Sequence, residues 1–419
     1  MLAIFASPGT INLVDAVSLG SRIRELREAA DISGEQLAVE LGVDGTAVSK
    51  IEHGKRSVKA SELATIARTL GVSPLAILEP DSLLGRLPVA ARSGSDMLDE
   101  AVHSRLQALA ELHSVLFDAG ITDPEIDSAW PEVDLSRWLA SAQELAEWCT
   151  QWLQPADTSD RFEALAEAME SKLGIDVLVE PTDSDSAMGA AITDPEFPIV
   201  FVNSKQIRAR AMFTLAHELG HVLSRDGVAL RVDRNLAGTD ERERFANAFA
   251  AELLMPKSVI EEMLRDKGRN AEGLAAIMVR LQVSFETLVY RLHNLRYIDA
   301  HGRDQFKSIG FGGLLTDLKD DALRGELLKL RTEMDLRRPP QLLLNRLLRG
   351  YFEGVVSARP IAGLLNATPE EVIAILKPDQ EMVSVSDSER LQVEPLIQFN
   401  APTDSPNLAP EELFAGSPV

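Results

Sequence analysis

One short stretch of the sequence carries two histidines and a glutamate at a spacing that can bind a metal ion. If residues 214–223 (Thr-Leu-Ala-His-Glu-Leu-Gly-His-Val-Leu) are helical, His217 and His221 lie four residues apart on one face. Glu218 then lies about 100° around the helix, where it can reach a water molecule on that metal. The pattern H-E-x-x-H on a helix is typical of zinc peptidases. The chain has only seven histidines, which disfavours the alternative of a solvated helix with incidental histidines.

A catalytic zinc ion needs three protein ligands and one open position. The metzincin pattern would place a histidine six residues after the second one, but Gly227 is there, and Asp226 is one residue out of register. The stretch 241–256 offers a better candidate, because Glu243 and Asn247 share a helix face. We therefore predict that Glu243 is the third ligand and that Asn247 hydrogen-bonds a ligand histidine. The apolar side chains predicted to be buried on this helix are Phe245, Phe249 and Leu253.

A small sheet followed by a long helix is predicted to position these residues. An amphipathic helix is predicted over 161–173. The predicted strands are 175–180, 187–192 and 198–202. Asn203 or Ser204 is predicted to cap the helix that carries the two histidines. This order of elements is the one expected of zincins.

A second set of residues, near the amino end, has the spacing of a DNA-binding helix-turn-helix. Ser33 and Gln36 predict the capping box of a short helix that ends at Gly42, and Asp44 is predicted to cap the next helix. That second helix and the residues after it offer polar side chains suited to base edges and phosphates. The predicted DNA contacts are Gln36, Thr46, Ser49, Lys50, Lys55 and Arg56.

The sequence over residues 36–56 resembles the Xre/Cro-type repressor DNA-binding domain, and the resemblance covers about 60 residues. It implies that a double-stranded DNA operator is a partner. Residues 18–78 contain eight basic and eight acidic residues. One domain of this charge should bind DNA weakly, so we expect a homodimer on an operator with two half-sites. A protein–protein module on the same scaffold is the alternative.

Two motifs, Phe-Thr-Leu-Ala-His-Glu-Leu-Gly-His and Glu-x-x-Ala-Asn-x-Phe-Ala-x-Glu-Leu-Leu-Met-Pro, resemble the ImmA/IrrE family of zinc metallopeptidases over roughly residues 160–295. The resemblance implies a gluzincin site, with His217, His221 and Glu243 on Zn²⁺ and Glu218 as the general base. It also implies a protein substrate, a repressor or antitoxin, whose cleavage switches genes on after stress, DNA damage or phage attack. Single-stranded DNA is a candidate activator.

Composition limits the class of protein. The net charge of −23 opposes non-specific binding to nucleic acid, so DNA binding must be local. Cys149 is the only cysteine, which excludes an intrachain disulfide and favours a reducing cytoplasm. No apolar run approaches the roughly 18 residues of a membrane span. No Lys or Arg precedes Arg22, which argues against a secretory signal. We expect a cytoplasmic protein without a membrane partner.

The sequence predicts a mainly α (α+β) protein of several parts. These are an N-terminal extension (1–17), a five-helix helix-turn-helix domain (18–78), a linker and helical connector (79–157), a zincin-like metallopeptidase domain with a small sheet (158–300), a C-terminal helical region (301–377) and an acidic, proline-rich flexible tail (378–419).

Three functions are compatible with these patterns. The first is a regulatory zinc endopeptidase, fused to its own DNA-binding domain, that cleaves a partner or itself. The second is an Xre-family transcriptional regulator with a non-proteolytic metal site. The third is an antitoxin-type or phage-defence protein that acts through protein contacts. The general base Glu218 favours the first, because a purely structural metal site does not need it.

Overall fold

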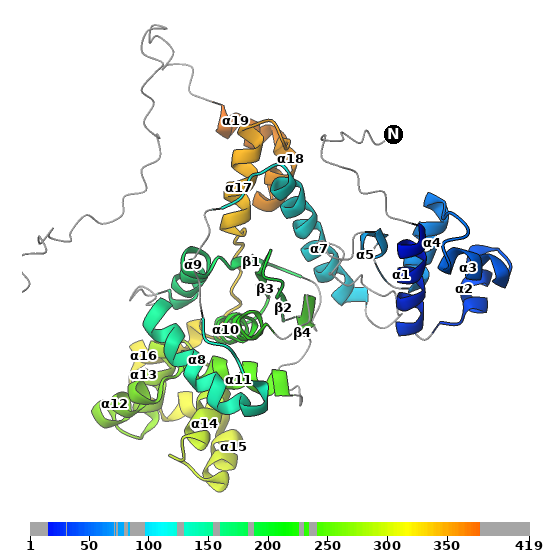
Figure 1. Cartoon of the computed structure of the whole chain (residues 1–419). Helices are drawn as coiled ribbons and strands as arrows, with labels where there is room; N and C mark the ends of the chain where they lie inside the picture. Colours follow the sequence, from blue (N-terminus) through cyan, green and yellow to red (C-terminus); the bar gives the residue numbers. More distant parts are fainter. Residues whose placement is uncertain are drawn as a thin grey trace, which may run out of the picture. The chain divides into compact units, whose positions relative to one another are not determined.

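The structure is a computed structural model, and it is mainly helical with one small sheet, as predicted (Figure 1). It describes residues 16–30, 32–70, 72, 74–78, 83, 97–123, 130–153, 160–182, 188–225, 230–233 and 241–377. The predicted acidic tail, most of the N-terminal extension and most of the linker lie outside the described residues.

Five helices form the amino-terminal domain. They are α1 (Ala16–Ala29), α2 (Gly34–Leu41), α3 (Gly45–Glu52), α4 (Ala60–Leu70) and α5 (Pro74–Leu78). The predicted caps are confirmed: Ser33 and Gln36 form the capping box of α2, and the Asp44 carboxylate accepts a hydrogen bond from the Ala47 amide at 2.8 Å. Gly42 has a φ of 65°, a left-handed conformation that closes α2 and turns the chain toward α3.

Helix α3 is held against α1 by an ion pair and a close backbone approach. Arg27 Nε donates to Glu52 Oε1 at 2.7 Å, and both side chains are mostly buried. A side chain at Gly20 would collide with the Ile51 carbonyl oxygen, so the glycine lets the two helices touch. The second helix of the helix-turn-helix is therefore fixed by packing as well as by its caps.

A connector of two long helices follows. It consists of α7 (Met97–Asp118), the 3₁₀ turn η1 (Leu135–Arg137) and α8 (Trp138–Leu153). A helical connector in this part of the chain was predicted from the sequence. Helix α8 buries the apolar side chains of one face, including Cys149, in the same core as the sheet and the metal-site helix. Burial raises the pKa of the Cys149 thiol, so this cysteine is an inert packing residue.

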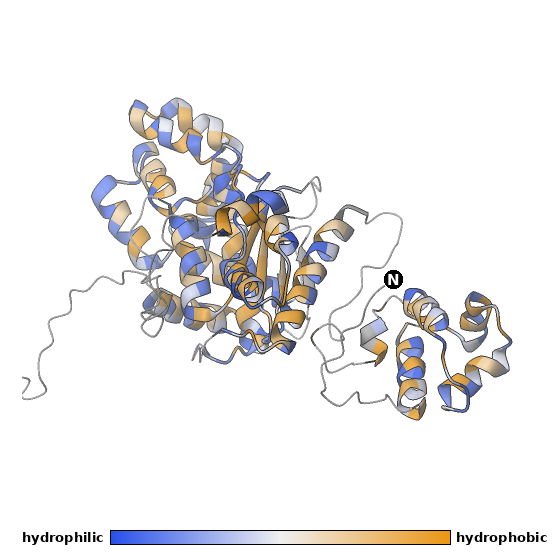
Figure 2. Ribbon diagram, turned by 90° about the horizontal axis from the view of Figure 1, so that it is seen from above, coloured by the Kyte–Doolittle hydropathy of each residue, from blue (hydrophilic) through white to orange (hydrophobic). Residues whose placement is uncertain are grey.

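The sheet has four strands in the order β1-β3-β2-β4. They are β1 (Asp176–Glu180), β2 (Gly189–Ile192), β3 (Ile199–Asn203) and β4 (Leu230–Asp233). Strand β3 pairs parallel with β1 and antiparallel with β2, and β2 pairs antiparallel with β4. Strands β1 to β3 confirm the prediction, whereas β4 was not predicted. The strands are among the most uniformly hydrophobic elements of the ribbon (Figure 2), as expected for a sheet buried by helices.

Helix α10 (Arg208–Ser224) contains the H-E-x-x-H motif and packs against β2, β3 and α11 (Glu241–Leu254). The predicted cap at Asn203 or Ser204 is wrong, because α10 begins after Ile207 and has no side-chain cap. Asn203 instead ends β3, and its side-chain oxygen accepts hydrogen bonds from the amides of Thr182 and Lys205. Such local bonds let asparagine close a turn rather than begin a helix.

The remaining elements are helical. They are α9 (Arg161–Leu173) before the sheet and, after α11, α12 (Lys257–Lys267), α13 (Ala271–Leu281), α14 (Phe285–Asn294), α15 (Ala300–Asp317), α16 (Asp321–Lys329), α17 (Gln341–Phe352), α18 (Ala358–Leu365) and α19 (Pro369–Leu376). In the described part of the chain, no single helix has the length and apolar composition to cross a membrane. Helices α13 and α14 meet that test only as a pair, which is bent by 105°.

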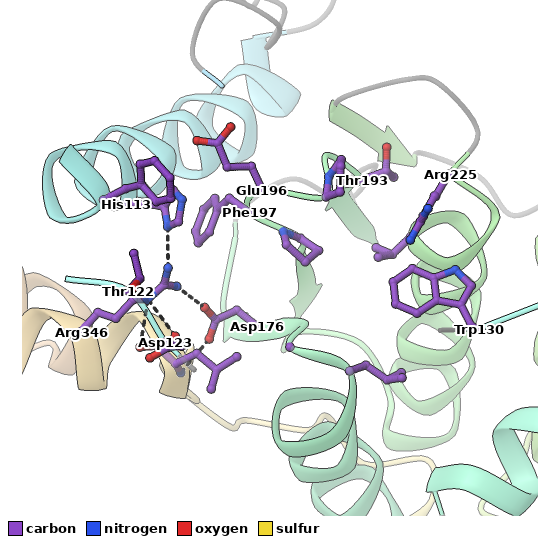
Figure 3. Close-up of a pocket in the computed structure, with 17 residues that line it drawn as sticks. His113, Thr122, Asp123, Trp130, Asp176, Thr193, Glu196, Phe197, Arg225 and Arg346 are labelled. Atoms are coloured by element: carbon purple, nitrogen blue, oxygen red, sulfur yellow. Dashed lines mark hydrogen bonds and ion pairs between the residues drawn. The ribbon is translucent and has the colours of Figure 1, made fainter. Parts of the chain in front are cut away.

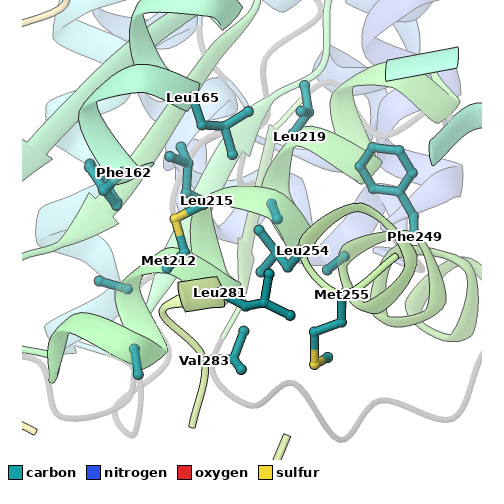
Figure 4. Close-up of a cluster of buried hydrophobic side chains, with 14 of the residues drawn as sticks. Phe162, Leu165, Met212, Leu215, Leu219, Phe249, Leu254, Met255, Leu281 and Val283 are labelled. Atoms are coloured by element: carbon teal, nitrogen blue, oxygen red, sulfur yellow. The ribbon is translucent and has the colours of Figure 1, made fainter. Parts of the chain in front are cut away.

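Residues beyond position 300 contribute to the central core. Figure 4 shows part of the buried cluster around α10. The same cluster includes Leu314, Leu318, Leu327, Leu330 and Met334. The predicted boundary at residue 300 is therefore not a break in the hydrophobic packing.

Arg338 ties this later segment to α9 and β1. Its Nη1 and Nη2 donate to the Glu170 carboxylate at 2.7 and 2.6 Å, and its Nε donates to Glu163 at 2.9 Å. Arg338 and Glu170 are both buried. The Arg338 backbone also exchanges two hydrogen bonds with Val179 at 2.9 Å, which continues the sheet beyond β1.

Candidate metal centre

Helices α10 and α11 bring three buried side chains to one point. His221 Nε2 lies 3.1 Å from His217 Nε2, and each of these nitrogens lies 3.5 Å from an oxygen of Glu243. All three side chains are buried and offer ligand atoms within 4.8 Å of one another. Bonds of about 2.0–2.1 Å to a tetrahedral zinc ion place ligand atoms about 3.4 Å apart, so these residues fit the ion.

Glu218 lies beside this cluster, against the start of strand β2. A Cβ at Gly189 would collide with Glu218 Oε1 and would lie 2.5 Å from the Thr214 methyl group. Because residue 189 is a glycine, the Glu218 carboxylate can occupy the space that a side chain would fill. Both the sheet and the motif helix thus fix the position of Glu218.

Gly220, inside the motif, sets the spacing between the two ligand-bearing helices. A Cβ there would lie 3.0 Å from the Phe249 ring and 3.2 Å from Ala246 Cα, tighter than ordinary packing. Glycine therefore lets α11 approach α10 closely enough for Glu243 to meet the two histidines. This role for a glycine between the histidines was not predicted.

A buried polar chain ties α10 to the sheet. Thr214 Oγ1 donates to Gln206 Oε1 at 3.0 Å. Gln206 Nε2 in turn donates to the carbonyls of Met188 at 2.7 Å and Asn203 at 3.0 Å. These bonds fix the rotation of α10 one turn before His217. Sequence reasoning missed Gln206, because a glutamine in a loop gives no local signal of this role.

A groove of about 760 Å³ runs along the same two helices. Phe213, one turn before His217, and Asn247, one turn after Glu243, both line it. The Phe213 ring stacks on the His217 imidazole with centroids 6.4 Å apart. Asn247 is half-buried on the predicted face, and its bond to a ligand histidine stays a prediction.

The predicted burial pattern of α11 is nearly correct. Phe245 and Phe249 are fully buried, as predicted, but Leu253 is only half-buried and Leu254 takes the core position. Leu254 belongs to the buried core cluster, whereas Leu253 packs against that cluster and is only partly buried.

The predicted DNA contacts are mostly exposed. Ser49, Lys50 and Lys55 project into solvent from α3 and the turn after it. The other three have partners within the domain. Gln36 Oε1 accepts from the Ser33 amide at 2.7 Å, Thr46 Oγ1 donates to Asp44 Oδ1 at 2.6 Å, and Arg56 is half-buried and paired with Glu62 at 2.6 Å. All six assignments stay predictions.

A second pocket, of about 320 Å³, lies at the carboxyl end of α10 (Figure 3). Arg346 donates to His113 Nδ1 at 2.5 Å and to Asp176 at 3.2 Å, as the dashed lines show. Burial lowers the pKa of His113 to about 4 and raises that of Asp176 to about 7. Val222 and Arg225, from the last turn and the cap of α10, complete its wall. Sequence reasoning did not find this pocket, whose charged residues are far apart in the chain.

A helix-turn-helix domain and a later domain that carries the buried His-His-Glu cluster thus lie in one chain. Residues 170–293 match the family described as the IrrE N-terminal-like domain, and residues 18–77 match the helix-turn-helix domain family. The chain therefore joins a helix-turn-helix domain to a domain similar to that of IrrE, as the two sequence resemblances predicted.

Three characterised proteins are similar to parts of the chain. The radiation response metalloprotease IrrE of Deinococcus radiodurans is 38% identical over 104 residues, which are 24% of this chain and 32% of IrrE. IrrE of Deinococcus deserti is 34% identical over 104 residues, 24% of this chain and 37% of that protein. The HTH-type transcriptional regulator ImmR of Bacillus subtilis is 26% identical over 111 residues, 26% of this chain and 80% of ImmR. The chain thus aligns with about a third of each IrrE protein.

Proposed function

We propose that this chain is a DNA-binding regulatory zinc endopeptidase of the gluzincin type. It cleaves a repressor or antitoxin partner, or itself, and so controls transcription in a stress or phage response. The observation that carries the proposal is the buried cluster of His217, His221 and Glu243 with Glu218 beside it. A non-catalytic metal site would not need the second glutamate.

The residues of the chain have distinct roles in this proposal. His217, His221 and Glu243 would hold the zinc ion, which when bound would lower the pKa of a water molecule and polarise the scissile carbonyl. Glu218 takes a proton from the attacking water and gives it to the leaving amine. Asn247 orients a ligand histidine. Gly189 and Gly220 leave room for the base and for the approach of α11.

The groove along α10 and α11 is the proposed substrate site. It combines aromatic side chains with arginines: Trp138, Phe213 and Tyr290 with Arg210, Arg244 and Arg291. Arg291 is neutralised by Glu252, with charge-assisted bonds of 2.6 and 2.5 Å. The lining also includes Glu286, so Arg210 and Arg244 leave it with a net charge of +1, which favours a peptide segment in which an acidic side chain lies near a bulky apolar one.

The amino-terminal domain supplies the proposed DNA function. In this proposal Ser49 and Lys50 contact base edges in the major groove, and Lys55 contacts phosphates. We propose a cytoplasmic homodimer on a two-half-site operator, with single-stranded DNA as a candidate activator. The similarity to the transcriptional regulator ImmR supports the alternative, an Xre-family regulator or antitoxin-type protein with a non-proteolytic metal site.

One experiment separates the two functions. The wild type, Glu218→Gln and the control Glu241→Gln are each loaded with zinc and incubated with products of neighbouring genes, with and without single-stranded DNA, and then resolved on a gel. Glu241 is exposed at the start of α11, so its variant should behave as the wild type. The endopeptidase predicts cleavage by the wild type and the control but not by Glu218→Gln. Operator binding without cleavage by any of the three would favour the regulator.

The zinc content of the variants tests the ligand set separately. Glu218→Gln should keep one zinc ion per chain, because this residue is not a ligand in our proposal. Glu243→Gln should lose most of the bound zinc, since a neutral amide is a poor zinc ligand. Equal zinc content in both variants would contradict the assignment of Glu243.

A further inference from the structure

Gln206 lies between strand β3 and helix α10, and only 5% of its surface is exposed. Its side-chain nitrogen and oxygen both have partners. Nε2 donates to the carbonyl oxygens of Met188 at 2.7 Å and Asn203 at 3.0 Å. Oε1 accepts from the Thr214 hydroxyl at 3.0 Å. Because a carbonyl oxygen can only accept a hydrogen bond, these contacts allow one orientation of the amide.

Two of these partners connect Gln206 to both sides of the Glu218 carboxylate. Met188 directly precedes Gly189, where an added Cβ would collide with Glu218 Oε1. Thr214 lies four residues before Glu218, one turn earlier on the same face of α10. Its methyl group would lie 2.5 Å from the same added Cβ. Gln206 thus joins the start of β2, on one side of the carboxylate, to the helix turn beneath it.

The backbone of Gln206 is held by a later part of the chain. The Met334 amide donates to the Gln206 carbonyl at 2.9 Å, and the Arg208 amide donates to the Thr332 carbonyl at 3.0 Å. Helix α10 has no side-chain cap, so this backbone contact satisfies one of its first amides. Both contacts come from beyond the family match at 170–293, so the start of α10 is supported from outside the matched residues.

Burial makes this arrangement sensitive to small changes. Thr214 and Glu218 are both 0% exposed, so the helix turn that carries them is closely packed. A buried amide or hydroxyl that loses its partner costs free energy, and the turn would shift to relieve that cost. A shift of about 1 Å in a catalytic group can slow a reaction about 10²-fold.

We propose that Gln206 is a positioning residue for Glu218. Through Met188 and Thr214 it fixes the strand and the helix turn between which the Glu218 carboxylate lies. The inference rests on the proposed peptidase function, in which Glu218 accepts a proton beside the metal. Since Gln206 is not one of the three proposed ligands, its loss should leave zinc binding unchanged and impair the reactions in which Glu218 takes a proton.

Isothermal titration calorimetry of the zinc-loaded full chain with acetohydroxamate tests the position of Glu218. This small zinc-binding molecule gives up a proton when it binds a zinc ion beside a carboxylate, and the carboxylate accepts that proton. Its affinity therefore reports on Glu218 without any peptide substrate. We expect Glu218→Gln to bind acetohydroxamate about ten-fold more weakly than the wild type, or weaker still, because a charge-assisted hydrogen bond is lost.

Variants of the positioning pair should reproduce this loss. Gln206→Met removes the amide at similar length, and Thr214→Val removes only the hydroxyl. Each should weaken acetohydroxamate about ten-fold, whereas zinc affinity, measured by competition with a chelator, should stay within about two-fold of the wild-type value. Thr214→Ser keeps the hydroxyl and should bind acetohydroxamate as the wild type does. Circular dichroism checks that each variant is folded.

Gln341→Met is the matched control. The Gln341 side-chain amide also donates to a backbone carbonyl, that of Pro339 at 3.1 Å, but this residue begins α17. The control should change neither affinity. An equal loss of acetohydroxamate affinity in Gln341→Met would overturn the proposal, because the effect would then be a general loss of stability.

The remaining outcomes separate the inference from the proposed function. Unchanged acetohydroxamate affinity in folded Gln206→Met and Thr214→Val, beside a weakened Glu218→Gln, would overturn the positioning role alone. Loss of zinc from the two variants would also overturn it, because the pair would then support the ligands. Equal affinities in the wild type and Glu218→Gln would overturn the proposed function, and the positioning role with it.

Discussion

Replacing Arg338 with methionine should strongly destabilise the sheet and helices around the metal site. The variant leaves Glu170, which is 4% exposed, as a buried carboxylate without its guanidinium. Breaking a buried ion pair from one side costs about 3–5 kcal/mol, because the remaining charge stays desolvated. Glu163 adds little, since its side chain is 39% exposed. With an m-value of about 2 kcal/mol/M, the urea midpoint should fall by about 2 M.

Tryptophan fluorescence measures this loss in the right part of the chain. The four tryptophans are Trp130, Trp138, Trp148 and Trp152. All of them precede the sheet: Trp130, Trp138 and Trp148 pack against its core, and the exposed Trp152 stacks on Trp148. None lies in the helix-turn-helix domain, so urea unfolding of that domain does not contribute to the signal.

A neighbouring arginine and a double variant provide the controls. Arg337 is exposed, so Arg337→Met should change the free energy of unfolding by less than about 0.5 kcal/mol. Adding Glu170→Gln to Arg338→Met removes the stranded charge and should recover more than about 1 kcal/mol. If Arg338→Met loses less than 1 kcal/mol, the later segment does not stabilise the core and the reasoning is wrong.

Three further predictions concern the site and its surroundings. Gly189→Ala should keep zinc but cleave substrate about 10²–10⁴-fold more slowly, because the added Cβ displaces the Glu218 carboxylate. A zinc assay and a cleavage gel check this prediction, and cleavage by the variant at the wild-type rate would refute it. As pH rises from about 4 to 6.5, the raised pKa of Asp176 lowers stability while the lowered pKa of His113 raises it. His113→Gln should therefore lose about 3 kcal/mol relative to the wild type over that range in urea titrations, and a constant difference would contradict the lowered pKa of His113. Chelating the metal should lower the melting temperature of the tryptophan transition, since bound zinc stabilises only the folded state; no shift would argue against binding at this cluster.

Much of the local structure follows from the sequence. The caps at Ser33, Asp44 and Gly174 are local rules, in which a side chain or a left-handed glycine satisfies backbone groups a few residues away. The pairing of the H-E-x-x-H helix with Glu243 could be inferred because each motif is a helical pattern of fixed spacing. The structure brings these residues together as that spacing predicts, although their roles in catalysis stay proposals.

The parts that were missed depend on contacts between distant residues. Strand β4 is four residues long and is a strand only because it pairs with β2. Asn203 has good capping chemistry but is used at the end of a strand, because the chain makes a turn there before α10 begins. The buried network around Arg346 joins side chains more than 160 residues apart, which no local pattern in a single sequence can reveal.

The contact between Glu170 and Arg338 also determines when the protein can finish folding as it is synthesised. The two residues are 168 positions apart, so Glu170 leaves the ribosome long before its partner exists. At about 5–20 residues per second, that interval lasts about 8–34 s. Before the end of this interval the metal ligands have been made, while the edge of β1 and the Glu170 carboxylate still lack the backbone and guanidinium of Arg338. Nascent chains should therefore interact with chaperones until α17 emerges, and a chain that ends near residue 300 would never leave that state.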